Sequence, residues 1–315
     1  MPRTVAVTGS TGFIGGHLVR QLVDSGYRVR VLTRRLPVSQ LFDGRSVEAV
    51  IGGLEDQDSL RELLAGADAV VHAAGLIKAP SREAFFAVNV AGVRRLIEAS
   101  GRHASPLRVI LLSSLAAREP QLSDYAASKR AGETALTQAA GGLAWTVIRP
   151  PVVYGPGDRE TLAFFRAAKR GLVPVPASDG ARISMIHVED LASAIIAVMT
   201  AESTVGATLE IDDGQAGGYS WDQLVGAAGA ALGVKPRLAR IPRSALGAVG
   251  HASRLFGAAT GRAPMLTPGK VREICHPDWA CRDRRVADLP GWRPARPLAA
   301  GFAETVGWYR AAGWL

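Results

Sequence analysis

A glycine-rich turn directly after the first apolar stretch constrains this chain more than any other feature. Glycines stand at positions 9, 12 and 15, after the apolar stretch 4–8. The first lets the chain turn sharply, the second lets the backbone approach a pyrophosphate, and the third lets a helix pack on the strand. Apolar residues then recur at helical spacing until Gly26. We therefore expect a dinucleotide site at the N-terminus of this helix, rather than an ordinary strand-to-helix turn.

Strand-like and helical stretches alternate through the first half of the chain. This alternation is typical of an α/β fold with a doubly wound parallel sheet, the Rossmann fold. We expect strands at 4–8, 27–33, 47–51, 68–74, 107–113 and 144–149, and helices at 12–25, 57–65, 83–100 and 124–140.

Prolines interrupt this pattern from Pro150 onward. We therefore predict a Rossmann domain at 1–150 and a smaller substrate-binding lobe at 151–315, with some return of the chain to the sheet. Further helices are expected at 158–170, 188–200 and 220–232, and the last of these opens with a capping box of Ser220 and Gln223.

Composition argues against a membrane-spanning or disulfide-bonded protein. Of 315 residues, 48% are hydrophobic and 21% charged, and no apolar run approaches the roughly 20 residues that a spanning helix needs. The first expected strand begins so early that no signal peptide precedes it, so we expect a cytoplasmic protein. The two cysteines, Cys275 and Cys281, lack a zinc-binding spacing, and we expect unligated thiols and no metal site.

The formal charge of +9 favours anionic partners, such as a phosphorylated cofactor, nucleic acid or an acidic membrane surface. The chain has neither a zinc-finger spacing nor a basic run interleaved with aromatic residues. We therefore expect no nucleic-acid partner.

A tyrosine and a lysine in the expected helix 124–140 form a second candidate site. Tyr125 and Lys129 are four residues apart and share one helix face. A nearby ammonium favours the phenolate and lowers the pKa of a tyrosine from its ordinary value of about 10, as acid–base catalysis requires. Ser113 and Ser114 end the preceding strand, and either hydroxyl could hydrogen-bond a substrate carbonyl. Each pattern alone is common, but together with the glycine turn they predict a catalytic site.

These motifs resemble those of the short-chain dehydrogenase/reductase family, in the extended or atypical branch that includes the NAD-dependent epimerases and dehydratases. The resemblance spans nearly the whole chain and lies in residues 8–15, 71–75, Asn89, Ser113 and Ser114, Tyr125 and Lys129, 149–157 and 186–190.

The resemblance implies an NAD(P)-dependent oxidoreductase with three catalytic residues. Ser114 orients the carbonyl, Tyr125 is the general acid or base, and Lys129 lowers the pKa of the tyrosine and holds the nicotinamide ribose. Ser113 could take the serine role instead, and Asn89 is a weaker candidate for a proton relay.

The implied cofactor site combines the glycine turn, strand ends and the catalytic helix. Its expected residues are Gly9, Thr11, Gly12, Phe13, Ile14, Gly15, Arg34, Arg35, Leu54, Ala73, Ala74, Gly75, Tyr125, Lys129 and Pro150. Gly53 stands where many extended members have an aspartate that contacts adenine, so the adenine contacts stay open.

The end of the second strand bears on the choice of cofactor. Arg34 and Arg35 stand where NAD-preferring sites place a carboxylate, and an arginine there accommodates a 2′-phosphate. We predict NADP(H) as the cofactor, with a solvated basic loop as the alternative.

Two departures from the nucleotide-sugar enzymes of this branch concern the substrate. Val152 replaces an asparagine that lies near the substrate diphosphate in those enzymes, and the serine-to-tyrosine gap is shorter. The chain is more similar to the 3-beta-hydroxysteroid dehydrogenase-like proteins and to the bacterial ceramide reductases of sphingolipid synthesis. We predict NADPH-dependent reduction of a lipid ketone such as oxidised ceramide or 3-ketosphinganine. The alternatives are a nucleotide-sugar epimerase or dehydratase and a non-catalytic NADP-binding assembly protein.

The segment 241–256 could form an amphipathic helix that rests on an anionic membrane, at its inner face, although packing on the protein's own core is the commoner role of such a helix. Arginines lie within and beside this segment, at Arg237, Arg240, Arg243, Arg254 and Arg262. The family resemblance also includes a homodimer through the helices that carry Asn89 and Tyr125.

Overall fold

The computed structural model divides the chain into two compact units. It describes residues 3–34, 42, 47–101, 107–139, 142–178, 180–260, 266–283, 289 and 291–315. Unit 1 comprises Met1–Arg149, Ala192–Leu209 and Asp288–Trp292, and unit 2 comprises Pro150–Leu191, Glu210–Ala287 and Arg293–Leu315.

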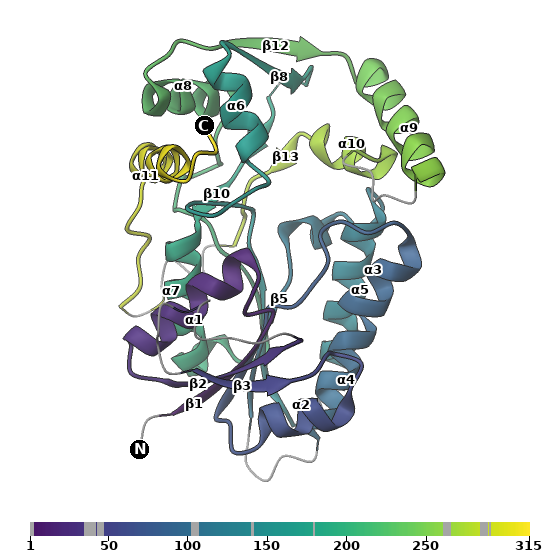
Figure 1. The fold of residues 1–315 in the computed structure, drawn as a ribbon, viewed down its shortest axis with the longest axis vertical. Helices are drawn as coiled ribbons and strands as arrows, with labels where there is room; N and C mark the ends of the chain where they lie inside the picture. Colours follow the sequence, from purple (N-terminus) through teal and green to yellow (C-terminus); the bar gives the residue numbers. More distant parts are fainter. Residues whose placement is uncertain are drawn as a thin grey trace. The chain divides into compact units, whose positions relative to one another are not determined.

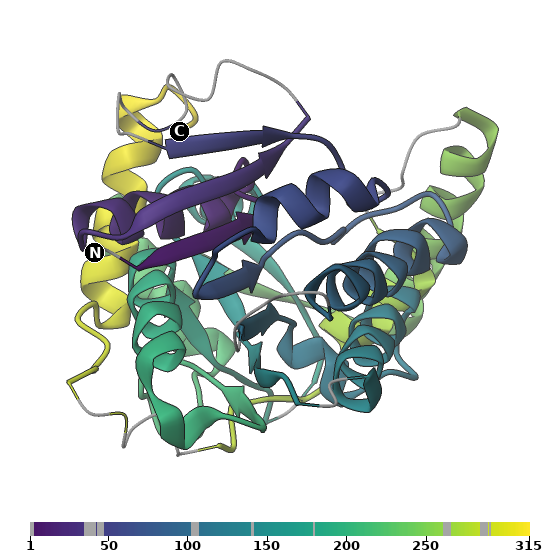
Figure 2. The ribbon, with the colours of Figure 1, turned by 90° about the horizontal axis from the view of Figure 1, so that it is seen from below.

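A seven-stranded sheet with helices on both faces forms unit 1 (Figures 1 and 2), which confirms the predicted Rossmann fold. The strand order is β11-β6-β5-β4-β1-β2-β3. All five pairings from β6 to β3 are parallel. The strands are β1 (Thr4–Thr8), β2 (Arg28–Thr33), β3 (Val47–Ile51), β4 (Ala69–His72), β5 (Arg108–Leu112), β6 (Ala144–Arg149) and β11 (Ala207–Glu210). The chain order reverses between β1 and β4, where a doubly wound sheet binds its ligand.

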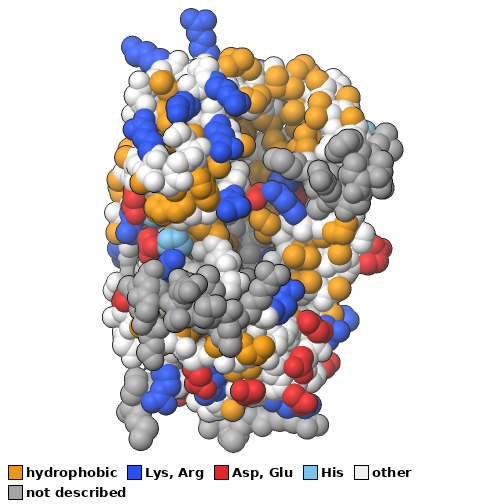
Figure 3. Space-filling view, viewed as in Figure 1, with side chains coloured by type: hydrophobic (Ala, Val, Ile, Leu, Met, Phe, Trp, Pro, Cys, Tyr) orange, Lys and Arg blue, Asp and Glu red, His pale blue; other side chains and the backbone are white. Residues whose placement is uncertain are grey.

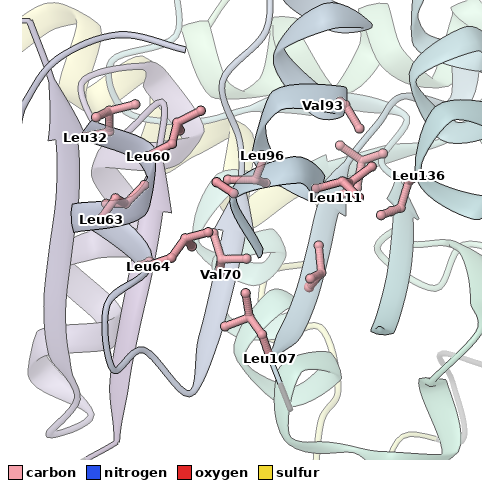
Figure 4. Packing of buried hydrophobic residues seen from close by; sticks show 14 of the residues in the cluster. Leu32, Leu60, Leu63, Leu64, Val70, Val93, Leu96, Leu107, Leu111 and Leu136 are labelled. Carbon is pink, nitrogen blue, oxygen red and sulfur yellow. The ribbon is translucent and has the colours of Figure 1, made fainter. Parts of the chain in front are cut away.

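A leucine-rich core packs one face of this sheet against three helices (Figure 4). Leu60, Leu63 and Leu64 of α2 (Gln57–Leu64) are almost fully buried, as is Leu96 of α4 (Ala91–Ser100). Burial of each such side chain contributes roughly 1.5–3 kcal/mol. The third helix is α5 (Asp124–Ala139), and unit 1 also contains α1 (Phe13–Asp24), α3 (Arg82–Asn89), the 3₁₀ turns η2 (Leu115–Arg118) and η3 (Glu202–Thr204), and part of α7 (Val188–Thr200).

The single helix expected at 83–100 is two helices, α3 and α4, interrupted at Val90. This interruption lies where α5 comes very close. A Cβ added at Gly132 of α5 would lie 2.4 Å from the backbone oxygen of Asn89. Helical spacing of apolar residues continues through both helices, so the pattern could not reveal the interruption.

Unit 2 surrounds a second core of aromatic and aliphatic side chains. Phe165, Phe302 and Tyr309 are nearly inaccessible, and the Phe165 and Phe302 rings meet edge to face with centroids 4.9 Å apart. Its remaining elements are β7 (Val152–Tyr154), α6 (Leu162–Lys169), β8 (Leu172–Pro176), β9 (Arg182–Ile183), β10 (Met185–His187), α8 (Trp221–Leu232), β12 (Arg237–Ile241), α9 (Arg243–Thr260), α10 (Pro268–Ile274), β13 (Asp278–Trp279) and α11 (Leu298–Ala311).

Helix starts in unit 2 follow local side-chain chemistry. The capping box at α8 is confirmed, with Gln223 N donating to Ser220 Oγ and Ser220 N to Gln223 Oε1. The expected helix at 158–170 begins only at Leu162, because the Asp158 carboxylate accepts the amides of Glu160 and Thr161 and holds a turn.

Both cysteines, Cys275 and Cys281, are buried in unit 2, and neither forms a disulfide. Within the described ranges, no helix has both the length and the apolar character needed to cross a bilayer.

Candidate functional site

The glycine turn between β1 and α1 packs tightly on the end of β4. Gly9 has φ +73°, and a Cβ there would lie 2.5 Å from Ala74 N. A Cβ at Gly15 would lie 2.1 Å from Gly9 O. These two glycines therefore allow backbone contacts that any side chain would prevent. Ala73 N donates to Thr8 O at 3.2 Å, which joins the turn to the predicted residues Ala73 and Ala74.

The N-terminus of α1 has the features of a phosphate site. Gly12 is the N-cap and provides no side-chain cap, and the first turn contains no acidic residue. Among the described residues, a Cβ at Gly12 would come within 4 Å of Gly9 O alone, at 3.2 Å, which leaves room at the turn for an approaching ligand. Unpaired amides and the helix dipole at such an end attract a pyrophosphate. The residues present therefore fit a dinucleotide, with Thr11 exposed, and Phe13 and Ile14 partly buried, beside the turn.

The other predicted cofactor residues have varied environments. Arg34 follows β2 directly and is exposed, whereas Arg35 lies outside the described residues. Leu54 is partly buried and packs on α4, since a Cβ at Gly92 would lie 2.8 Å from Leu54 Cδ1. Pro150 is buried and is the first residue of unit 2.

Helix α5 carries both Tyr125 and Lys129, four residues apart on one face. Lys129 Nζ donates to Leu112 O, 2.8 Å away at the end of β5. A Cβ at Gly75, beyond the end of β4, would lie 3.5 Å from the same Nζ. Lys129 thus joins α5 to the ends of two neighbouring strands, which is where the strand order predicts the ligand.

Burial makes the Lys129 ammonium unusually acidic. Loss of hydration lowers its pKa to about 8, and the negative charge of Glu133 opposes this shift. A lysine with such a pKa exchanges its proton near the physiological range, as residues of catalytic sites often do.

The two candidate serines have different partners. Ser113 is buried and donates to Glu133 Oε1 at 2.5 Å. Ser114 is only partly buried, and its Oγ accepts from Ala116 N at 3.2 Å as the N-cap of η2. Within the described part of the chain, the Ser114 hydroxyl donates to no protein group. Ser114 is therefore the hydroxyl available to a ligand.

Asn89 holds the loop that follows β4. Its Oδ1 accepts from Leu76 N at 2.8 Å, and its Nδ2 donates to Leu76 O at 3.0 Å and to Ser128 Oγ at 2.9 Å. Asn89 is buried and lies 3.1 Å from the position of a Cβ at Gly75. Its amide thus connects α3, α5 and the loop next to Lys129.

His72 ends β4 as a neutral, buried ring. Its Nδ1 lies 2.9 Å from Thr8 Oγ1, whose oxygen also accepts from Ala74 N at 3.3 Å. Burial, together with the nearby positive charge of Lys129, lowers the pKa of His72 to about 3. The ring is therefore uncharged at neutral pH and does not repel the ammonium.

Glu133 was not singled out from the sequence, and Arg149 was noted only as the first residue of the family motif 149–157, without a role. Arg149 donates from Nε to Glu133 Oε1 at 2.8 Å and from Nη2 to Oε2 at 2.6 Å. Glu133 follows Lys129 by four residues, so the helical spacing that singled out the tyrosine and lysine extends to it.

Comparisons with known proteins agree with this architecture. Residues 5–211 match the model of the NAD dependent epimerase/dehydratase family. A relative named ceramide reductase, from Caulobacter vibrioides, is 43% identical over 99% of this chain and 96% of its own length. Sterol demethylase protein B of Methylococcus capsulatus is 29% identical over 98% of this chain and 99% of its own. The crystal structure of gox2253 has a similar fold, with a TM-score of 0.80, 21% identity and 100% coverage of both chains.

Proposed function

Because the chain belongs to the NAD dependent epimerase/dehydratase family, we propose that it reduces a ketone on a lipid-like substrate, an oxidised ceramide or 3-ketosphinganine, with NADPH. The observation that carries this proposal is the meeting of Lys129, on the same face of α5 as Tyr125, with the ends of β4 and β5. The full-length likeness to a ceramide reductase supports the substrate class.

The proposed reaction converts the ketone to a secondary alcohol. When bound, the nicotinamide supplies the hydride to the carbonyl carbon. Ser114 donates a hydrogen bond to the carbonyl oxygen and orients it, and Tyr125 transfers its phenolic proton to that oxygen as negative charge develops. The Lys129 ammonium stabilises the phenolate that remains and binds the nicotinamide ribose. One hydride and one proton are thus added, and the cofactor is oxidised.

NADPH is the proposed cofactor because of the charge at the end of β2. Arg34 is exposed directly after this strand, where a ribose 2′-phosphate would be recognised, and Arg35 follows it in the sequence.

A panel of ketones would test the proposed substrate class. We expect NADPH oxidation, followed by absorbance, with 3-keto long-chain bases or their N-acylated forms, and the preferred form identifies the head group. UDP-sugars are the control, because a nucleotide-sugar epimerase would convert them while keeping tightly bound NAD. Conversion of a UDP-sugar, with no response to any keto-lipid, would contradict the proposal. Cofactor binding without any turnover would instead favour an assembly protein.

Peripheral contact with an anionic membrane is part of the proposal, because a lipid substrate resides there. Residues 223–272 contain eight Lys and Arg and no Asp or Glu. On α9, Gly250 packs on α10, since a Cβ there would lie 2.9 Å from Val271 Cγ2. The opposite face is apolar and exposed (Figure 3), with Ala245, Ala248, Val249 and Ala252. Apolar and basic groups together favour an anionic bilayer.

Vesicle binding of the full chain would test this surface. We expect cosedimentation with vesicles of phosphatidylglycerol and phosphatidylcholine that weakens with salt and is absent with phosphatidylcholine alone. Val249→Glu should weaken binding at least about fivefold. Ile51→Glu on β3 is the matched control, because Ile51 and Val249 are 52% and 56% exposed. Equal vesicle binding by Val249→Glu and Ile51→Glu would contradict the assignment of this face of α9 to the membrane.

The homodimer through α3 and α5 stays a prediction, which analytical ultracentrifugation would test.

A further inference from the structure

A buried carboxylate, Glu133, lies two helical turns beyond Tyr125 on α5. Only 4% of its surface is exposed. A buried carboxylate is costly unless it is paired and hydrogen-bonded, so its partners show what it stabilises.

Glu133 connects three elements of unit 1. Its Oε1 accepts from Ser113 Oγ at 2.5 Å, and Arg149 at the end of β6 binds both of its oxygens. Arg130, on its own helix, lies 3.7 Å away. Ser113 also donates its backbone amide to Ile148 O at 2.7 Å. The residue directly before Ser114 is thus fixed through both its side chain and its backbone.

The same carboxylate acts on Lys129. Among the described titratable groups, Tyr125 and Glu133 each lie one helical turn from Lys129 on α5, and His72 on β4 interacts electrostatically with it. Arg130 and Arg149 both lie against Glu133. His72 is neutral, and the Arg149 guanidinium is paired with Glu133 in a bidentate ion pair. Glu133 is therefore the negative charge that keeps a buried ammonium protonated.

We propose that Glu133 is a positioning residue of the active site, which fixes the Ser113–Ser114 backbone and presents its negative charge to Lys129, one helical turn away on the same face of α5. This inference rests on the proposed function for the role of Ser114, whereas the effect on Lys129 concerns cofactor binding alone.

Glu133→Gln tests the effect on Lys129, since glutamine keeps the shape of the side chain and removes its charge. Without that charge the pKa of Lys129 falls, so the ammonium is lost at a lower pH. We expect the alkaline limb of NADPH affinity, and of kcat where a keto-lipid is turned over, to move down by about one pH unit. NADPH affinity is measured by fluorescence and needs no lipid, so a wrong substrate class would not obscure this result.

Glu133→Asp tests the effect on the serine backbone. The shorter carboxylate keeps its charge but cannot reach Ser113 and Arg149 together. For Glu133→Asp we expect the alkaline limb of NADPH affinity to stay at its wild-type pH and kcat to fall about tenfold or more.

Glu273→Gln is the control for loss of a buried charge. Glu273 is also 4% exposed and accepts from Lys270 Nζ at 2.9 Å, but it lies in unit 2. Glu273→Gln should lower the free energy of unfolding and leave the alkaline limb of NADPH affinity at its wild-type pH. If Glu133→Gln is folded and its NADPH affinity has the same alkaline limb as wild type, the proposal is overturned. If circular dichroism shows that Glu133→Gln is unfolded, a kcat of Glu133→Asp equal to that of wild type would overturn it.

Discussion

Lys129 combines two requirements that oppose each other. The side chain must lie under the strand ends to reach Leu112 and the loop at Gly75, and this burial penalises its charge. In the protein without cofactor, this buried charge therefore lowers the free energy of unfolding. A bound cofactor or substrate can offset that cost.

Replacement of Lys129 by methionine should stabilise the protein without cofactor. The folded-state pKa is about 8 against 10.5 in the unfolded chain, so the charge penalty is fully present at pH 7. We expect the free energy of unfolding at pH 7 to rise by about 1–3 kcal/mol, less the lost bond to Leu112. The unfolded chain binds more protons between pH 8 and 10.5, so wild-type stability rises there and the gain of the variant shrinks.

Urea unfolding at pH 7 and at pH 10 measures this gain. Lys169→Met on α6 is the control, because Lys169 is exposed and its replacement should change stability little. A Lys129→Met variant less stable than wild type at pH 7 would show that the ammonium is not under this penalty.

The serine pair provides a second prediction at this scale. We expect Ser114→Ala to lower kcat at least about a hundredfold, because it removes the donor to the carbonyl oxygen. Ser113→Ala should cost stability, because it removes a bond to buried Glu133, and should lower kcat less. Steady-state kinetics of the two variants decides the assignment, and the reverse order would transfer the serine role to Ser113.

The division of roles between Ser113 and Ser114 could not be predicted from the sequence. Adjacent serines have the same local pattern, and only the contact between Ser113 and Glu133 distinguishes them. That contact joins residues from a strand and a helix, so no spacing in the sequence reveals it. The pairing of Glu133 with Arg149 was missed for the same reason.

At the scale of elements, the placement of α5 depends on a residue without a side chain. Gly132 lies against the backbone oxygen of Asn89, which cannot move without disturbing α3. The helix α5 can therefore approach α3 this closely only because position 132 is glycine.

We expect Gly132→Ala to lower the free energy of unfolding by about 1–3 kcal/mol and to reduce kcat, because the added methyl group displaces α5 and with it Tyr125. Gly226→Ala is the matched control, since Gly226 lies within α8 and, in the part of the chain that the structure describes, an added Cβ would have no neighbouring atom within 4 Å. It should stabilise the protein by about 0.5–1 kcal/mol. Thermal unfolding of both variants measures the contrast, and equal effects would contradict the packing argument.

The elements of unit 1 were predictable because their apolar periodicity is long and regular. The exceptions are β11, η2 and η3, which were not expected, and the interruption at Val90, where tertiary packing of α5 overrides a continuous helical pattern. In unit 2 the strands β9, β10 and β13 have only two or three residues, too few for periodicity to define. The capping box of α8 was predictable because it depends on two side chains three residues apart.

On the scale of the whole molecule, every predicted cofactor residue except Pro150 belongs to unit 1. Unit 1 contains the glycine turn, the predicted catalytic residues and the arginine after β2. Unit 2 contains the basic segment without acidic residues, and most of the short strands. Cofactor binding should therefore stabilise unit 1 directly.

NADPH should stabilise the protein more than NADH at the same concentration. At a hundred times its Kd, a ligand raises the free energy of unfolding by about 2.7 kcal/mol. We expect Arg34→Ala/Arg35→Ala to weaken NADPH binding about tenfold and to leave NADH binding nearly unchanged. Arg28→Ala, at the opposite end of β2, is the control. Isothermal titration of both cofactors measures these affinities, and equal losses for both would refute a 2′-phosphate contact.

The most direct test of the account is NADPH oxidation with an oxidised ceramide, compared between wild type and Tyr125→Phe. Phenylalanine keeps the ring beside Phe85 and removes the phenolic proton. We expect turnover by wild type, a loss of at least about a thousandfold in the variant, and NADPH affinities that agree within about threefold. Undiminished turnover by Tyr125→Phe would contradict the assigned chemistry.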